Sequence, residues 1–507
     1  MTRNLTEAMP SQITLTKLLV LLGLALTFTW MAHVNHIAEY DESLHLDVAR
    51  SIYQTGVPIR SIRDGVAYLY HPPLFLYLLA PVTGPLEDGT LIGRWISGAF
   101  GLLSVAIVFK LVDELIDRRA AVLAGLLVAL SPLFQIYAFS VQAEVMLTAL
   151  ILAGLLAFAV AWRTRLTRYA WLTGIMFALA VWVKFLAVLP IGACALYGLL
   201  SFRRRRTFRE LLALIVPPSL ALCAWVGFGL ALDRAVFQQV MQSWFSGPQW
   251  PWDPRMHFTF ADWLLVLVRD VLSYPGAILL LTTFPLRVRL YRRGSRLVVF
   301  EIYAMLMLIY SMFSSVKEVR HLIPLAPVAA ILITSGVVEL IQGVPWLRQA
   351  GWRRSLAVGV MVLALVEASP LTLLPDERPA SWQNWLDKPL VARVFDNDAY
   401  LTNVRDAGQY LKQLTPADAV IPVVHEGTVA GYYANRRYVL LYVLSSDEIM
   451  DVVENSRWLL VDKDLYPNLN NVEVERVKSY IADHFASVAR FATSGPAATV
   501  YQRLDYP

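Results

Sequence analysis

The sequence is poor in charged residues and in cysteine. Charged side chains make up only 16% of its 507 residues, against about 25% in an average soluble domain, which excludes an ordinary soluble enzyme. Its two cysteines, Cys194 and Cys223, both lie in apolar runs, where cysteine acts as a small core residue. A disulfide scaffold and a zinc site built from cysteines are therefore excluded.

Apolar and aromatic residues are abundant instead. Hydrophobic residues make up 57% of the chain and aromatic residues 12%, and the mean hydropathy is +0.52. Disordered chains are poor in both kinds of residue. The composition therefore indicates a polytopic membrane protein.

Net charge changes sign along the chain. Residues 376–507 carry 13 Lys/Arg and 18 Asp/Glu, a net charge of −5. Residues 1–375 carry 31 Lys/Arg and 21 Asp/Glu, a net charge of +10. We expect a membrane domain over 1–375 and a soluble domain over 376–507. The basic residues lie in loops between apolar runs and form no basic face on a soluble fold, so no nucleic-acid partner is expected.

Apolar runs of the right length predict about 11 transmembrane helices. A helix needs about 20 apolar residues to cross the bilayer core. The first run is longer than a signal-peptide core and lacks a cleavage site of small residues, so it is interpreted as a retained anchor. The candidate spans are 15–34, 91–112, 120–137, 144–162, 170–183, 186–202, 211–232, 264–286, 297–313, 322–341 and 355–374.

Arginine clusters between these runs indicate the orientation, because short loops rich in Lys and Arg stay in the cytoplasm. The stretch 170–202 has such a cluster at each end and would be about 50 Å long as one helix. It is too long for one crossing, so we expect a hairpin with Lys184 at its tip. A stretch between two cytoplasmic arginine clusters must cross the membrane an even number of times. Applied along the chain, this rule places the N-terminus in the cytoplasm and the C-terminal domain outside.

The last 132 residues show the pattern of a small α/β domain. Strand-like runs cover 419–424, 438–444 and 458–461, and helical periodicity covers 404–414, 446–455 and 474–485. Ser445 and Glu448 have the spacing of a capping box. The domain lacks a glycine-rich phosphate loop, metal-ligand spacing and a nucleophile elbow, so we do not expect it to catalyse.

Ionisable residues from separate segments fall at the outer ends of the expected helices. Such residues are costly at membrane depth and are often functional, although a single one near a helix end can extend to the headgroups. The first outer loop, 35–90, is also long, which favours a functional role. The polar residues at this face are Asp41, Glu42, Tyr70, His71, Glu144, Lys184, Lys317, Glu318, Arg320 and His321.

Acids and bases on one face suit a phosphorylated substrate. Lys and Arg hold phosphate through charge-assisted hydrogen bonds. Two adjacent acids, Asp41 and Glu42, cannot point the same way on leaving a helix, so one can face a reaction centre while the other ties the loop down. We therefore expect a carboxylate base opposite a bound phosphate leaving group.

These motifs resemble the polyprenyl-phosphate-sugar-dependent glycosyltransferases of GT-C architecture, in particular the protein O-mannosyltransferase and aminoarabinose-transferase group. The acidic pair of that family falls on Asp41 and Glu42, its His-Pro-Pro motif on 71–73, its second loop acid on Glu144, and its basic segment on 320–324. The resemblance covers about residues 15–345. His321 departs from the pattern, since tyrosine is commoner there, and the C-terminal domain does not resemble the sugar-binding repeats of eukaryotic mannosyltransferases.

The resemblance implies transfer of a sugar from a polyprenyl phosphate to an acceptor hydroxyl, with inversion at the sugar carbon. It makes Asp41 the general base, with Glu42 or Glu144 orienting acceptor or sugar. The implied catalytic residues are Asp41, Glu42 and Glu144, the implied donor-phosphate residues are Lys184, Lys317, Arg320 and His321, and Tyr70 and His71 belong to the substrate loop.

Several points stay open at this level. No metal site or other cofactor is required, although a divalent cation among Asp41, Glu144 and His71 is an alternative. The expected partners are the lipid-linked donor, membrane lipids, and an acceptor glycan, lipid or protein. The expected location is a bacterial inner membrane, with catalysis on the periplasmic side. A lipid-linked sugar flippase or transporter and a non-catalytic membrane assembly protein are the alternative functions.

Overall fold

The structure is a computed structural model, and not every segment of the chain is described. It describes residues 40–63, 65–129, 131–200, 207–246, 264, 267–268, 274–292, 296–313, 319–343, 390–462, 470–492 and 496–504. The expected spans 15–34 and 355–374 and the candidate Lys317 lie outside these residues. The expected domain boundary near residue 375 also lies outside them and stays a prediction.

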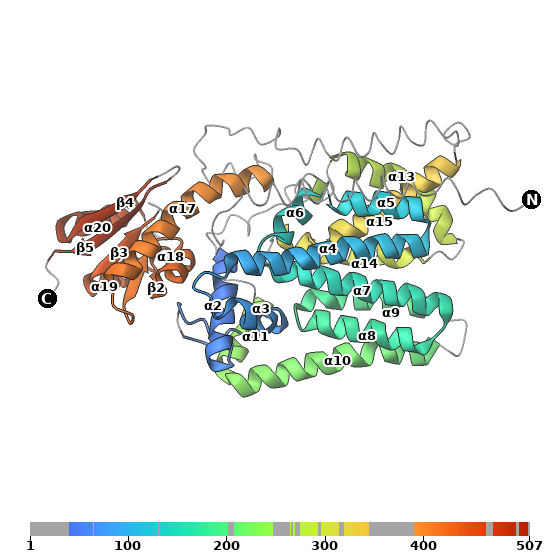
Figure 1. Cartoon of the computed structure of the whole chain (residues 1–507), viewed down its shortest axis with the longest axis horizontal. Helices are drawn as coiled ribbons and strands as arrows, with labels where there is room; N and C mark the ends of the chain where they lie inside the picture. Colours follow the sequence, from blue (N-terminus) through green and yellow to red (C-terminus); the bar gives the residue numbers. More distant parts are fainter. Residues whose placement is uncertain are drawn as a thin grey trace, which may run out of the picture.

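A bundle of apolar helices forms the larger part of the molecule (Figure 1). Among the described residues, four helices are long and apolar enough to cross a membrane: α4 (Thr90–Leu115), α7 (Ala143–Thr164), α10 (Thr207–Leu232) and α15 (Leu325–Gly343). Further helices accompany them: α8 (Thr167–Val181), α9 (Val188–Leu200), α11 (Arg234–Ser246), α13 (Tyr274–Arg292) and α14 (Val298–Phe313). The expected helical class is confirmed, whereas the number of spans stays a prediction.

Within the expected stretch 170–202, the described residues 170–200 fold as a hairpin. Helix α8 ends at Val181, Lys184 adopts an extended conformation, and the 3-10 turn η1 (Phe185–Ala187) leads into α9. A small cavity of about 20 Å³ is lined by Ala170 near the start of α8 and by Gly198 near the end of α9. The two ends of the stretch therefore lie at the same level, and Lys184 lies at the opposite one.

One expected helix is wrong in its extent, and a second is only partly described. The run 120–137 is divided into α5 (Arg118–Ala129) and α6 (Pro132–Ala138), because proline has no backbone N–H and disfavours a helical residue before it. The Gln135 side chain donates to the Ala129 carbonyl at 2.7 Å across this break. In the run 264–286, residues 265–266 and 269–273 lie outside the described residues, and α13 covers the run from Tyr274 onward.

The first outer loop is ordered between the bundle and the C-terminal domain. Helix α2 (Tyr40–Thr55) is followed by a β-bridge between Ile59 and Ala67, and then by α3 (Leu74–Thr83). Gly65 turns the chain inside this bridge with φ of +69°, a conformation that favours glycine. In Figure 1, α2 and α3 lie at the end of the bundle that faces the C-terminal domain.

The C-terminal domain contains a mixed sheet with the order β2-β1-β3-β5-β4 among the described residues. β1 (Val420–Val423) is parallel to β2 (Arg437–Leu440) and β3 (Trp458–Val461), whereas β5 (Ala498–Arg503) is antiparallel to β3 and β4 (Phe485–Phe491). The helices are α17 (Leu390–Leu414), α18 (Gly427–Ala434), α19 (Ser446–Glu454) and α20 (Asn471–His484). The α/β class and the Ser445–Glu448 capping box are confirmed; β4, β5 and α18 were not expected.

Candidate active site

Helix α2 begins with the two adjacent acids, which have opposite surroundings. The Asp41 side chain is 29% exposed and forms an ion pair with Arg320, whereas the Glu42 side chain is fully buried. Both acids lie in the first turn of α2, where the helix dipole favours negative charge. Only Asp41 is therefore accessible to a reacting group.

Glu42 joins α2 to α4 and to the connection between α6 and α7. Its carboxylate accepts hydrogen bonds from Arg94 of α4 at 2.9 and 3.1 Å, and from the Val141 N–H at 2.6 Å. The His45 ring lies one turn further along α2, and its Nδ1 is 2.8 Å from the Val141 carbonyl oxygen. Both backbone groups of Val141 are thus held by α2, three residues before Glu144.

Three charged groups from separate segments of the chain lie beside Asp41. Lys184 Nζ lies 2.5 Å from Glu144 Oε1, and Arg320 Nε lies 3.5 Å from the same oxygen. Arg320, in the turn η4 (Val319–Leu322), also contacts Asp41. The side chains of Glu144 and Lys184 are 1% and 8% exposed, so these charges interact in a medium less polar than water.

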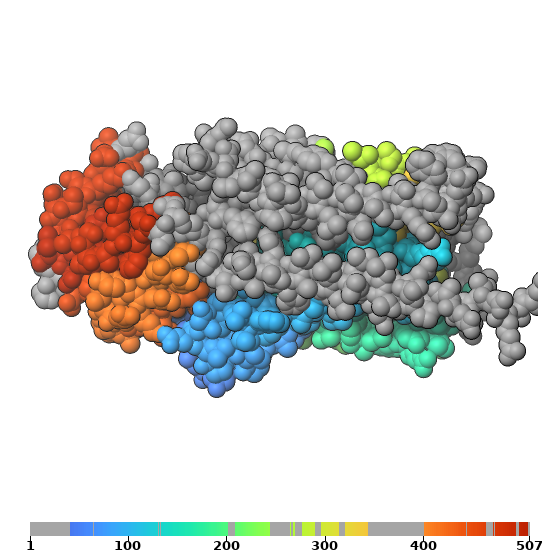
Figure 2. All heavy atoms as spheres, turned by 45° about the horizontal axis from the view of Figure 1, so that its top comes forward, coloured from blue at the N-terminus to red at the C-terminus, as the bar shows by residue number. Residues whose placement is uncertain are grey.

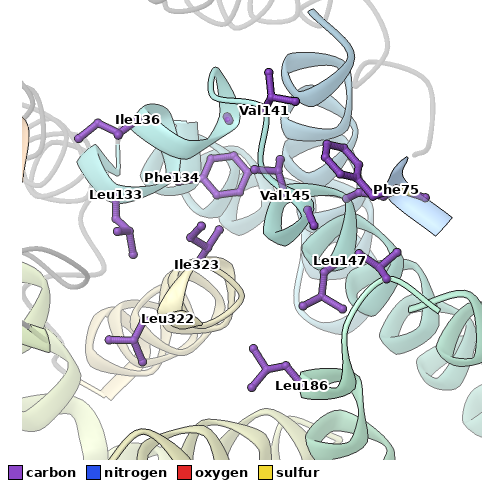
Figure 3. Packing of buried hydrophobic residues seen from close by; sticks show 14 of the residues in the cluster. Phe75, Leu133, Phe134, Ile136, Val141, Val145, Leu147, Leu186, Leu322 and Ile323 are labelled. Carbon is purple, nitrogen blue, oxygen red and sulfur yellow. The ribbon is translucent and has the colours of Figure 1, made fainter. Parts of the chain in front are cut away.

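An apolar layer packs against this charged cluster. Buried hydrophobic residues follow Glu144, Lys184 and Arg320 within three positions of each in the sequence. Figure 3 shows buried hydrophobic residues of this region, which come from α6, α7, η1, η4 and the residue after η4. They include Phe134, Val145, Leu147, Leu186, Leu322 and Ile323. This packing excludes water from one side of the cluster and strengthens its electrostatics.

The His-Pro-Pro segment lies next to the hairpin tip. The Leu74 N–H, at the start of α3, donates to the Trp182 carbonyl at 3.1 Å, which satisfies one of the backbone donors that a helix start leaves open. Burial, together with the nearby cations Lys184 and Arg320, holds the pKa of His71 well below its usual value. The His71 imidazole is therefore neutral at physiological pH.

Tyr70 borders this segment. The Arg60 guanidinium lies 5.8 Å from the centre of the Tyr70 ring, and the ring of Tyr68 lies 6.3 Å from it. Arg60 and Tyr68 are buried. They bring a cation and a phenol close to the charged cluster, within the first outer loop.

The structure brings together most of the residues expected at this site. Asp41, Glu144, Lys184, Arg320, His71 and His321 lie near one another. Glu42 faces Arg94 and Val141 instead, and Lys317 lies outside the described residues. Within the described part of the chain, no three His, Cys, Asp or Glu side chains are arranged to hold a metal ion.

Sequence reasoning did not single out Arg94, Arg60 or Tyr68. Arg94 lies inside a run expected as a membrane span, where an arginine needs a partner. The buried Glu42 is that partner. The pairing of an intramembrane arginine with an acid at the start of the outer loop was therefore the signal that could have identified it.

Comparison with known proteins agrees with the resemblance to GT-C enzymes. Residues 70–227 match the family described as dolichyl-phosphate-mannose-protein mannosyltransferase. No curated protein matches the sequence.

Solved structures match almost the whole chain. ArnT from Cupriavidus metallidurans in the apo state has a TM-score of 0.66 at 15% identity, covering 95% of this chain and 97% of that one. ArnT from the same organism bound to undecaprenyl phosphate has a TM-score of 0.65 at 14% identity, covering 96% of this chain and 98% of that one. The archaeal oligosaccharyltransferase AglB from Archaeoglobus fulgidus, in complex with an inhibitory peptide and a dolichol-phosphate, has a TM-score of 0.57 at 13% identity, covering 93% of this chain and 71% of that one.

Proposed function

We propose that this chain, a multi-pass membrane glycosyltransferase of GT-C fold, transfers a sugar from a polyprenyl-phosphate donor to an acceptor nucleophile at the outer face of the membrane. The observation that carries the proposal is the cluster of Asp41, Glu144, Lys184 and Arg320, in which one accessible carboxylate lies beside two cations.

Asp41 is the proposed general base. A base must reach the proton that it removes, and the Asp41 side chain is 29% exposed whereas those of Glu42 and Glu144 are 0% and 1% exposed. Removal of the acceptor proton by Asp41 allows the acceptor oxygen to attack the sugar carbon. Attack from the side opposite the phosphate inverts that carbon as the sugar–phosphate bond breaks.

Lys184 and Arg320 are the proposed phosphate ligands. Their charges are balanced by Glu144 and Asp41, and phosphate oxygens can take the place of carboxylate oxygens on the same N–H donors. Held in a partly water-excluded site, these donors stabilise the charge that develops on the departing phosphate. His321 and Lys317 are proposed to complete the phosphate site.

The remaining candidates are proposed to position the reacting groups. Glu144 holds Lys184 and Arg320 in place, and Glu42 holds the start of α2 against Arg94. The neutral His71 and Tyr70 border the site from the substrate loop. A divalent cation would have to compete with Lys184 and Arg320 for the Asp41 and Glu144 carboxylates, so we propose a reaction that does not depend on one.

The fold supports the proposal of a lipid-linked donor. ArnT and AglB are solved with undecaprenyl phosphate and dolichol-phosphate, and this chain offers apolar helices beside its charged cluster. We propose a bacterial inner membrane location, with the N-terminus in the cytoplasm and the site and C-terminal domain on the periplasmic side. The acceptor is a glycan, a lipid or a protein.

The test is sugar transfer by the purified chain in nanodiscs. A panel of polyprenyl-phosphate sugars is offered with and without acceptor extracts, and mass spectrometry detects the released polyprenyl phosphate. We expect release with one donor, and a rate at least about 100-fold lower in Asp41→Asn, since a positioned base contributes about 10² to 10⁴.

A matched control is Asp447→Asn, which neutralises an exposed acid in the C-terminal domain and should leave the rate unchanged. Wild-type transfer that persists in Asp41→Asn would remove Asp41 as the base. Transport of intact donor across the membrane without sugar transfer would instead support the flippase alternative.

A further inference from the structure

The C-terminal domain contacts the first outer loop through Arg50 of α2. The Arg50 guanidinium donates to the Glu87 carbonyl at 2.7 Å and to Asn435 Oδ1 at 3.2 Å. It also lies 5.1 Å from the centre of the Tyr432 ring, a distance at which a cation is attracted to an aromatic face. One side chain thus joins α2, the turn before α4, and α18.

Tyr432 and Lys412 extend this contact to the start of α4. The buried Tyr432 hydroxyl accepts a hydrogen bond from the Gly89 N–H at 3.0 Å, and Gly89 is the N-cap residue of α4. Lys412 of α17 forms an ion pair with Glu87 in the same turn. The start of α4 is therefore fixed by the C-terminal domain as well as by the bundle.

A hydrogen bond joins the edge strand of the C-terminal domain's sheet to the first outer loop. The Tyr438 N–H, in strand β2, donates to the Ile62 carbonyl at 2.9 Å, and Ile62 lies between the bridged residues Ile59 and Ala67. A Cβ atom added at Gly65 would lie 2.7 Å from the Arg437 guanidinium. The segment 59–67 is thus packed directly against the edge of the sheet. Figure 2 shows the orange atoms of the domain meeting the blue atoms of the loop.

All three contacted elements carry residues of the candidate site. Helix α2 begins with Asp41, α4 carries Arg94, which holds Glu42, and the segment 59–67 carries Arg60. In contrast, Glu144, Lys184 and Arg320 lie on α7, the hairpin tip and η4. The C-terminal domain therefore contacts the elements that hold the proposed base, and the phosphate ligands lie elsewhere.

We propose that the C-terminal domain is an intramolecular brace of the first outer loop, and that Arg50 and Tyr432 are positioning residues for sugar transfer. The brace holds α2 so that Asp41 stays aligned with the phosphate site. The catalytic part of this inference rests on the proposed function, whereas the bracing itself does not.

The brace predicts a specific division of kinetic effects. Loosening α2 displaces the base, and a shift of about 1 Å in a reacting group can cost about 100-fold in rate. Binding of the lipid phosphate through Lys184 and Arg320 should change little. We expect kcat for sugar transfer to fall about 10- to 100-fold in Arg50→Ala, with KM for the polyprenyl-phosphate sugar within about twofold of the wild type.

A second variant and a readout independent of activity complete the test. Tyr432→Phe keeps the ring beside Arg50 but removes the acceptor of the Gly89 N–H, so its kcat should fall less. Amide hydrogen exchange of the full chain in nanodiscs should accelerate at 59–68 and 84–89 in Arg50→Ala, since local opening governs exchange. Exchange at 145–160 of α7 should be unchanged.

Arg476→Ala is the control, because Arg476 forms an exposed ion pair with Asp447 within the same domain and should alter neither kcat nor exchange. Wild-type exchange at 59–68 and 84–89 in Arg50→Ala would overturn the brace, and faster exchange with unchanged kcat would overturn the positioning role. If the wild type transferred no sugar, the proposed function would fail, and the exchange data would still decide the brace.

Discussion

At the scale of single residues, helix geometry separates the roles of two neighbouring acids. Successive side chains on an α-helix are about 100° apart. Asp41 therefore faces Arg320 while Glu42 faces Arg94 and the Val141 N–H. The same geometry places His45 one turn after Glu42, on the same side of α2, where it contacts the Val141 carbonyl. One face of α2 thus anchors the helix, and the next presents the proposed base.

Asp47 lies further along α2 and predicts a pH dependence of stability. Burial raises the pKa of its carboxyl from 3.8 to about 6. Hydrogen bonds from the Ser61 hydroxyl and the Ile62 N–H lower the pKa, but burial has the larger effect. The folded state therefore binds more protons than the unfolded state between these values. The resulting stability is fully present below pH 3.8 and is lost as the pH rises through about 6.

The reference for this effect is Asp47→Asn, because an asparagine side chain cannot ionise and the variant therefore lacks this pH dependence. Relative to this variant, the free energy of unfolding of the wild type should fall by up to about 3 kcal/mol as the pH rises from about 3.5 to about 7. Midpoints of thermal denaturation in detergent at both pH values provide the measurement. An unchanged difference between the two proteins at both pH values would contradict the raised pKa.

At the scale of elements, helix pairs depend on glycines that allow close approach. Gly154 lies in the middle of α7, and a Cβ atom there would lie 2.5 Å from the ring of Phe177 in α8. Phe177 is fully buried, so its ring has no space into which to move. The position of α8 relative to α7, and with it the Lys184–Glu144 pair, depends on this contact.

We expect Gly154→Ala to destabilise the bundle by about 1 to 3 kcal/mol, the usual cost of overpacking a core. Gly227→Ala is a matched control in α10, since a Cβ atom there would meet nothing within 4 Å. It should be neutral or stabilising by up to about 1 kcal/mol, because alanine favours helix more than glycine. Equal denaturation midpoints for the two variants in detergent would show that α7 and α8 are not tightly packed at this point.

At the scale of the whole molecule, ion pairs mark the two ends of the bundle. In α4, Arg94 pairs with Glu42 near one end, and Glu114 pairs with Arg163 at 2.9 Å near the other. Arg296 also lies 3.7 Å from Glu114. From Arg94 to Glu114 the chain advances by 20 positions, which is about 30 Å of helix and matches the bilayer core. The charged groups therefore lie near the two membrane surfaces.

This arrangement predicts which residues face each side of the membrane. In a background with Cys194→Ala and Cys223→Ala, we expect Arg476→Cys to react with a membrane-impermeant maleimide in intact spheroplasts. Arg118→Cys should react only after the membrane is permeabilised, because arginine-rich short loops stay in the cytoplasm. Labelling of both positions from the same side would contradict the proposed orientation and the expected odd number of membrane crossings between the two positions.

Local patterns in the sequence predicted the elements that short-range interactions control. Hydropathy predicted the apolar helices, arginine clusters predicted the hairpin around Lys184, and the spacing of Ser445 and Glu448 predicted the cap of α19. Motif order predicted that Asp41, Glu144, Lys184 and Arg320 would gather at one face. Such features follow from side-chain type and spacing along the chain, which are the quantities that a sequence displays directly.

Only the tertiary structure decided which of these groups touch. The pairing of Glu42 with Arg94, the addition of β4 and β5 to the sheet, and the docking of Tyr432 and Asn435 on Arg50 all join residues far apart in the sequence. Hydrogen bonds, ion pairs and packing between distant segments depend on geometry across the whole fold, and no local periodicity encodes them. The sequence by itself therefore determined the class of protein and predicted which charged residues gather at one face, while the fold decided which carboxylate is exposed and which is buried.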